Sequence, residues 1–129
     1  MRKYLFLLPF VLSLFPLQVY SRSLNDKYFN NSNFAKTDNV SLHYRLWTTD
    51  EAGPKGKILL IHGFGGSTFS WEKIAPVLSN NGYFVVAVDV PPFGFSQKRS
   101  NLNGSIGARA ELVNDFIKYL DAETNWHLV

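Results

Sequence analysis

Two short, uninterrupted apolar runs constrain the fold of this chain more than any other feature. The first lies in residues 57–61, where four apolar residues follow Lys57, and the second covers residues 83–88. Each is followed at once by a polar residue, His62 and Asp89. A short continuous apolar run is typical of a strand that is buried on both faces, as in a parallel sheet. Parallel neighbours need a long crossover between them, which the intervening residues can provide. The pair of runs therefore predicts an α/β fold.

Further elements extend this pattern on both sides. Residues 40–47 alternate apolar with polar side chains, which predicts a half-buried strand near a sheet edge. Residues 71–78 carry apolar side chains at helical spacing, and Gly82 supplies the stop signal. Residues 106–124 show one apolar face of an amphipathic helix, and residues 126–129 begin another strand. We expect a mostly parallel sheet with flanking helices that is incomplete at its C-terminal end.

The N-terminal residues differ in character from the rest of the chain. Residues 1–3 are basic, and residues 4–20 then run without a charge. This is the pattern of a secretory signal, and because the apolar run is shorter than about 20 residues, a cleaved signal is favoured over a membrane anchor. We expect a signal or anchor over residues 1–23, a polar spacer over residues 24–39, the folded domain over residues 40–129, and an exported protein that is secreted, periplasmic or membrane-anchored.

The formal charge of +3 does not indicate a polyanionic partner. Arg2, Lys3 and Arg22 account for all of it, and from Leu24 onward ten basic residues balance ten acidic ones without any basic run. Nucleic acid is therefore excluded as a partner class. The absence of cysteine excludes disulfides and a lipid-modified cysteine.

Gly63, Gly65 and Gly66 follow the first apolar run, where open α/β sheets place their ligand sites. Exposed backbone N–H groups in such a turn can hold a phosphate or stabilise an oxyanion. The phosphate alternative, a Rossmann-like nucleotide-binding domain, is disfavoured because Thr68 occupies the position of the third glycine of the dinucleotide fingerprint. A Walker loop is absent as well, since no Gly-Lys-Ser or Gly-Lys-Thr occurs.

Two loops carry a more specific resemblance. His62-Gly63-Phe64-Gly65-Gly66 and Asp89-Val90-Pro91-Pro92-Phe93-Gly94-Phe95-Ser96 each follow an apolar run, and together they resemble the N-terminal half of an α/β-hydrolase. The resemblance covers residues 40–129. It implies that His62, Gly63, Gly65 and Gly66 form an oxyanion loop and that the backbone N–H of Phe64 is a catalytic donor. It also implies that His62 fixes the loop geometry, while Asp89 organises the turn after it. Pro92 departs from the common pattern, which has glycine there.

The sequence contains no nucleophile elbow. Its nearest match, Asn103-Gly104-Ser105-Ile106-Gly107, lacks the first glycine and follows a polar loop, so Ser105 is better interpreted as a helix N-cap. The resemblance places the elbow directly after the strand that begins at residue 126. We therefore expect a truncated N-terminal fragment of a hydrolase whose Ser (or Asp)-His-acid triad lies beyond residue 129.

The intact enzyme is expected to hydrolyse an ester or other acyl bond of a small molecule without cofactor or metal, and this chain alone to be inactive. Neither the substrate nor the oligomeric state follows from the residues. The alternative is that the chain is a non-catalytic α/β binding or interaction module.

Overall fold

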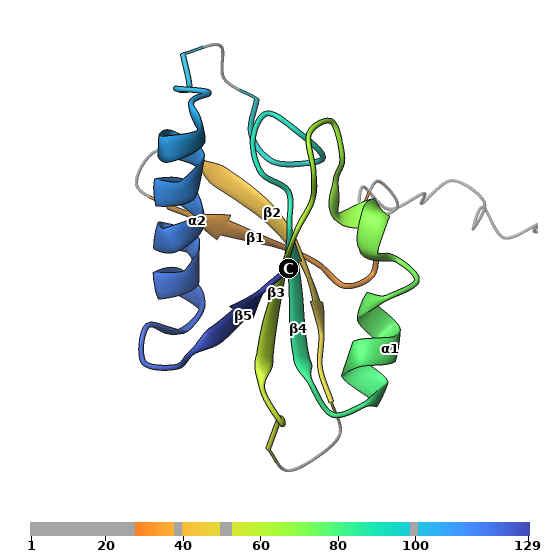
Figure 1. Ribbon diagram of the computed structural model, residues 1–129. Coiled ribbons are helices and arrows are strands. Elements are labelled where there is room, and N and C mark those ends of the chain that lie inside the picture. Colours follow the sequence, from red (N-terminus) through yellow and green to blue (C-terminus); the bar gives the residue numbers. More distant parts are fainter. Residues whose placement is uncertain (1–27, 38–39, 50–52, 99–100) are drawn as a thin grey trace, which may run out of the picture.

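The computed structural model describes residues 28–37, 40–49, 53–98 and 101–129. Five strands form one sheet in these residues, in the order β1-β2-β4-β3-β5 (Figure 1). The strands are β1 (Ser32–Lys36), β2 (Ser41–Trp47), β3 (Lys57–Ile61), β4 (Phe84–Val88) and β5 (Trp126–Leu128). The helices are the 3₁₀ turn η2 (Thr68–Trp71) and the α-helices α1 (Ala75–Asn80) and α2 (Ile106–Asp121). The α/β class predicted from the sequence is confirmed.

The two predicted buried strands lie side by side and in parallel. β3 pairs in parallel with β4 on one side and with β5 on the other, whereas β2 is antiparallel to β4 and β1 is antiparallel to β2. The sheet is therefore mixed, and its parallel part is confined to β4, β3 and β5. Ile61 lies opposite Val88 in the register, so the loops that follow β3 and β4 leave the sheet next to each other.

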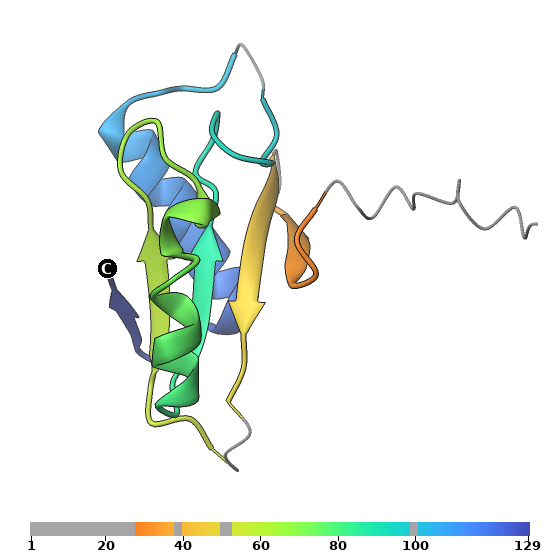
Figure 2. The ribbon, with the colours of Figure 1, turned by 90° about the vertical axis from the view of Figure 1, so that its right-hand side faces the viewer.

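Side chains on β3 and β4 point alternately to two apolar layers, as the pleat of a strand requires. Leu59 and Val86 pack on the face covered by α2, where Phe116 is fully buried. Leu60 and Val85 pack on the opposite face, beneath α1 and η2 (Figures 1 and 2). Burial of each such side chain contributes about 1.5–3 kcal/mol, so the two central strands hold both layers together.

The segment that precedes β4 is less regular than predicted. A helix was expected from Trp71 to Leu78, but the chain forms the 3₁₀ turn η2 and then restarts as α1, with Pro76 in its first turn. Proline is accepted only in the first turn, because it has no N–H and clashes with the preceding turn when it lies deeper in a helix. The predicted stop is confirmed, since Gly82 has φ +89° and its N–H donates to the Ser79 carbonyl.

The long helix α2 begins and ends through side-chain hydrogen bonds. Ser105 is the N-cap, as predicted, and its hydroxyl accepts from the Ala108 N–H at 3.2 Å. The helix ends at Asp121, three residues before the expected Thr124. Asp121 accepts the Glu123 N–H at 3.0 Å, and such a local bond competes with continuation of the helix.

The prediction of a polar spacer up to residue 39 is wrong for residues 32–36, which form the edge strand β1. The pairing of β1 with β2 is regular, with Phe34 opposite His43 and Ala35 opposite Leu42. Apolar periodicity failed to reveal this strand because Ser32 contacts a buried polar side chain of β2 instead of an apolar core.

The polar face of β2 was expected to be exposed, yet His43 is fully buried and Arg45 is almost so. Several partners of Arg45 explain why a charged side chain is buried here. Its guanidinium forms an ion pair with Glu72, its Nε donates to Asn31 Oδ1 at 2.8 Å, and it lies 3.8 Å above the centre of the Phe29 ring. The second face of β2 is therefore covered by the segment around β1 and by η2.

The predicted signal or anchor over residues 1–23 lies outside the described residues. Within the part of the chain that is described, no helix has the length and apolar character needed to cross a membrane.

Candidate active site

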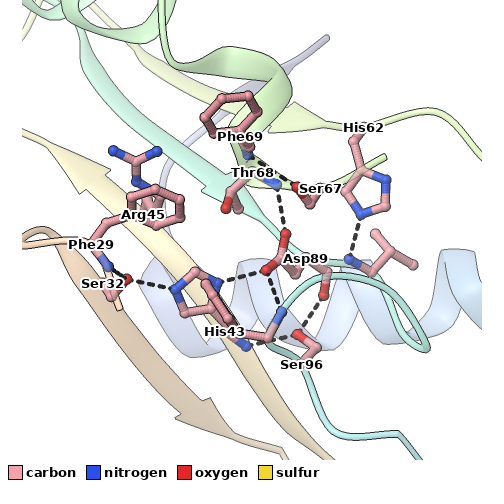
Figure 3. Close-up of polar contacts among 12 residues, drawn as sticks. Phe29, Ser32, His43, Arg45, His62, Ser67, Thr68, Phe69, Asp89 and Ser96 are labelled. Carbon is pink, nitrogen blue, oxygen red and sulfur yellow. Dashed lines mark hydrogen bonds and ion pairs between the residues drawn. The ribbon is translucent and has the colours of Figure 1, made fainter. Parts of the chain in front are cut away.

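The site predicted from the sequence lies where β3 and β4 end. The first residue after β3 is His62 and the first residue after β4 is Asp89, and each begins one of the two loops singled out above. Because these strands are parallel neighbours, both loops lie at the same edge of the sheet. Figure 3 shows that the side chains of His62 and Asp89 both reach toward backbone of the other loop.

The glycine loop makes a tight turn over residues 63–66. The Gly66 N–H donates to the Gly63 carbonyl at 3.0 Å, and Gly65, third in the turn, has φ +77°. A positive φ at that position is the mark of a type II turn and strongly favours glycine. In such a turn the N–H of the second residue takes no part in the closing bond, and that residue is Phe64.

The Phe64 N–H has no hydrogen-bond acceptor among the described residues. Its side chain is 90% exposed and meets only the edge of Phe93 in an aromatic contact, with ring centres 5.4 Å apart. A cavity of about 430 Å³ adjoins the loop, and His62, Gly63 and Phe64 form part of its wall, opposite α2. The free donor therefore lies beside a space of the size that holds small ligands.

His62 ties its own loop to the loop after β4. Its Nε2 accepts the Val90 N–H at 2.9 Å, so in this arrangement the ring proton sits on Nδ1, which donates to the Gly63 carbonyl at 2.8 Å. Both ring nitrogens are thus occupied by backbone partners. This geometry leaves His62 no free nitrogen with which to act as a base, and it agrees with the role of fixing the loop.

Asp89 makes the reciprocal connection. Its Oδ1 accepts the Thr68 N–H at 2.6 Å, at the end of the glycine loop, and its Oδ2 accepts the Phe95 N–H at 2.8 Å in its own loop. The expected bond from Asp89 to the turn after it is therefore confirmed, and the bond to Thr68 is additional. Asp89 is fully buried, and Gly94, with φ +57°, passes so close that no side chain would fit between them.

The environment of Asp89 favours its charged form. Burial alone would raise the pKa of this carboxyl group, but the hydrogen bond from His43 and those from the Phe95 and Thr68 N–H groups outweigh it, together with the charge of His43, and the pKa falls below 3.8. A carboxylate that accepts several N–H groups is the usual way in which a buried acid remains ionised.

His43 on β2 adds a side-chain donor to Asp89. The His43 Nδ1 lies 2.7 Å from Asp89 Oδ2, and the His43 Nε2 lies 2.7 Å from Ser32 Oγ on β1 (Figure 3). Ser32, His43 and Asp89 therefore have the connectivity of a catalytic triad. None of the three lines the cavity beside Phe64. This agrees with the sequence-based interpretation of Asp89 as a residue that organises the turn after it.

Ser96 completes this network. Its hydroxyl donates to the Asp89 carbonyl at 2.5 Å and accepts the His43 N–H at 2.7 Å. Sequence analysis placed Ser96 at the end of the second loop but assigned it no role. The only signal in the sequence was its place at the end of the loop that begins with Asp89. In the part of the chain that is described, there is no group of three or more His, Asp or Glu side chains that could hold a metal ion.

Comparison with known proteins decides the family. A family model described as an alpha/beta hydrolase fold matches residues 57–129, from β3 to the end of the chain, and includes both loops. The chain belongs to the α/β-hydrolase fold family. Membership accounts for the position of the glycine loop and disfavours the Rossmann-like alternative. The 3₁₀ turn that follows the loop also differs from the long helix that a dinucleotide-binding turn opens.

Several α/β-hydrolases resemble the chain in sequence or structure. An uncharacterized hydrolase, YugF, of Bacillus subtilis is 29% identical over 86 residues, and epoxide hydrolase B of Mycobacterium tuberculosis is 37% identical over 73 residues. The crystal structure of a membrane phospholipase A has a TM-score of 0.67 and 32% identity over 75% of this chain. The Cif epoxide hydrolase from Acinetobacter nosocomialis has a TM-score of 0.64 and 27% identity over 78% of this chain.

The chain is short beside all of these α/β-hydrolases. The matches cover 30% of the Bacillus hydrolase, 19% of the mycobacterial epoxide hydrolase and 30% of each of the two solved structures. The residues described above therefore correspond to the first part of the family's fold. They contain the glycine loop but no nucleophile elbow.

Proposed function

We propose that this chain is the N-terminal part of a hydrolase that cleaves an ester or other acyl bond of a small molecule. In this proposal the nucleophile, a serine or an aspartate, the catalytic histidine and the acid all lie beyond residue 129. The Phe64 N–H donates to the oxyanion that forms when the nucleophile attacks the carbonyl carbon. His62, Gly63, Gly65 and Gly66 hold that donor in place.

One observation carries this proposal: a backbone N–H, unpaired within the described part of the chain, at the second position of a tight turn that lies beside a cavity and after a central strand. An N–H bound to another protein group could not stabilise an oxyanion without first losing that bond. Among the described residues nothing accepts the Phe64 N–H, while the neighbouring groups on His62, Gly66 and Thr68 are all engaged. The turn is therefore rigid around a donor that is available, which is the preorganisation that oxyanion stabilisation needs.

Export belongs to the same proposal. The basic start and the charge-free run over residues 4–20 support a signal or anchor over residues 1–23. One of the similar solved structures is that of a membrane phospholipase A, and this likeness is compatible with a location at a membrane. Expression of the full-length protein in its own cells, followed by fractionation and N-terminal sequencing, would separate a cleaved signal from a retained anchor.

Two experiments test the enzymatic proposal. The first is to read the coding sequence after residue 129, where we expect a Gly-x-Ser-x-Gly elbow, or a related one with aspartate, within about ten residues, because strands average about 5–6 residues. An intact reading frame that stops there would contradict the proposal and favour a non-catalytic module.

The second experiment removes the Phe64 N–H as a donor, although the ester also weakens the Gly63 carbonyl as an acceptor for the Gly66 N–H and His62. In the full-length protein, incorporation of phenyllactic acid at position 64 replaces the N–H with an ester oxygen and keeps the side chain. We expect kcat for p-nitrophenyl butyrate to fall by about 10²–10³, the usual effect of losing one oxyanion donor. The matched control is the same replacement at Phe69, whose N–H donates only to the Ser67 hydroxyl at 3.3 Å. Equal, small effects at both positions would refute the role of Phe64.

A further inference from the structure

The glycine loop is held from two sides, and one of these connections runs far from the cavity. His62 fixes the start of the loop to Val90, and Asp89 fixes its end through the Thr68 N–H. The orientation of the Asp89 carboxylate therefore helps to set the position of the whole turn, including Phe64. Besides the Phe95 N–H of its own loop, the carboxylate has a side-chain donor, His43, that lies outside both loops.

The carboxylate is held from β2 and β1. His43 lies on β2 and its Nδ1–H donates to Asp89 Oδ2, because a carboxylate can only accept. In the neutral ring His43 Nε2 is then an acceptor, and the partner placed to donate to it is the Ser32 hydroxyl on β1. Ser32 Oγ in turn accepts the Phe29 N–H at 3.1 Å. With the ring neutral, all the donors in this chain of hydrogen bonds point the same way, from the Phe29 N–H through Ser32 and His43 to Asp89.

Burial makes these hydrogen bonds important for the position of the Asp89 carboxylate. His43 and Asp89 are both fully buried, so a lost hydrogen bond cannot be replaced by bulk water at either side chain. The Phe34 and Phe95 rings flank the His43 ring, with ring centres 5.2 Å away in each case, and they limit its tilt. The imidazole thus has a single well-packed orientation, in which each of its nitrogens has one partner.

We propose that Ser32 and His43 are positioning residues for catalysis, which place the Phe64 donor through Asp89 and the Thr68 N–H. This inference rests on the proposed function, since it concerns the same oxyanion donor. It assigns a part in the geometry of the reaction to the edge strand β1, which β2 and β4 separate from β3, the strand that leads into the glycine loop. Ser32 and His43 do not touch the substrate in this proposal.

The test uses Ser32→Ala, His43→Asn and the double variant in the full-length protein. Asparagine can still donate to Asp89 but is too short to reach Ser32. We expect each single variant to lower kcat for p-nitrophenyl butyrate by about 3- to 10-fold, the effect of one hydrogen bond, with KM unchanged. The double variant should be no slower than the slower single variant, because Ser32 acts only through His43.

Asn33→Ala is the matched control. It changes the neighbouring residue of β1, whose side chain donates to the Asn31 carbonyl and takes no part in this chain of hydrogen bonds. We expect its kcat to stay within twofold of the wild-type value. A fall in kcat equal to that of Ser32→Ala would mean that any disturbance of β1 has this effect, and it would overturn the proposal.

Amide hydrogen exchange distinguishes this inference from the proposed function, because it needs no turnover. In Ser32→Ala and His43→Asn, exchange should accelerate at residues 63–68 and stay unchanged in β4. Unchanged exchange in the loop, or acceleration of the same size in β4, would overturn the positioning role. If the wild-type protein hydrolyses no ester, the proposed function fails, and the exchange comparison alone decides whether Ser32 and His43 hold the loop.

Discussion

Replacing Gly94 with alanine should be among the most damaging single substitutions in the described part of this protein. Gly94 has φ +57°, a conformation that costs other residues about 1–2 kcal/mol. A Cβ atom built there would lie 2.0 Å from both Cγ and Oδ2 of Asp89 and 2.4 Å from its Oδ1. Such distances are far inside van der Waals contact, so the Asp89 carboxylate or the backbone must move.

The size of the effect follows from the partners of that carboxylate. Asp89 accepts hydrogen bonds from Thr68, Phe95 and His43, and bonds to a charged group contribute about 1.5–3 kcal/mol each. Loss of two of them, together with the backbone strain, gives a destabilisation of at least about 4 kcal/mol. Since the free energy of unfolding of natural domains is about 5–15 kcal/mol, Gly94→Ala should leave the fold marginal or unfolded.

Urea unfolding of the wild-type and variant proteins measures this effect, and Gly65→Ala supplies the control. Gly65 also has a positive φ, +77°, but a Cβ atom there would meet nothing within 4 Å, so it carries the backbone strain alone. We expect Gly94→Ala to cost at least about 2 kcal/mol more than Gly65→Ala. Equal costs of the two glycine substitutions in the wild-type background would refute the reasoning.

Two further predictions concern stability. Because the pKa of Asp89 is lowered in the folded protein, its contribution to the free energy of unfolding is present above pH 3.8 and is lost as the pH falls from there through the lowered value. The difference in the free energy of unfolding between wild type and Asp89→Asn, measured with urea, should shrink over that range. A constant difference would contradict this prediction. Phe116→Ala should lower the free energy of unfolding by about 3–5 kcal/mol, because this ring is fully buried between α2 and the sheet. Lys118→Ala, on the exposed side of the same helix, should lower it by under about 0.5 kcal/mol. Similar losses of stability in the two variants would show that α2 does not pack as described.

The central part of the fold follows from local patterns. Residues 58–61 and 83–88 are apolar throughout, and such a run is typical of a strand covered on both faces. The structure places β3 and β4 there, within one residue of the predicted bounds. The loops after them were also predictable, because a glycine turn after a buried strand is a local signal that needs no distant partner.

The edge of the sheet did not follow from local patterns. Ser32 and His43 occupy inward-facing positions that would normally hold apolar side chains, so residues 32–36 look like a polar spacer and residues 40–47 look half exposed. The burial of His43 depends on Asp89, more than 40 residues further along the chain, whose charge makes a polar partner favourable. Periodicity along the sequence cannot predict burial that depends on hydrogen bonds between distant residues.

The reciprocal bonds of His62 and Asp89 limit how the two loops could be exchanged in protein engineering. Each residue accepts an N–H from the loop that the other begins, so neither loop has a complete set of partners without its neighbour. A loop grafted alone from another member of the family would leave a buried N–H or carboxylate oxygen unmatched on the host side. Grafts that transfer both loops together, with the first residue of each, keep these reciprocal hydrogen bonds intact.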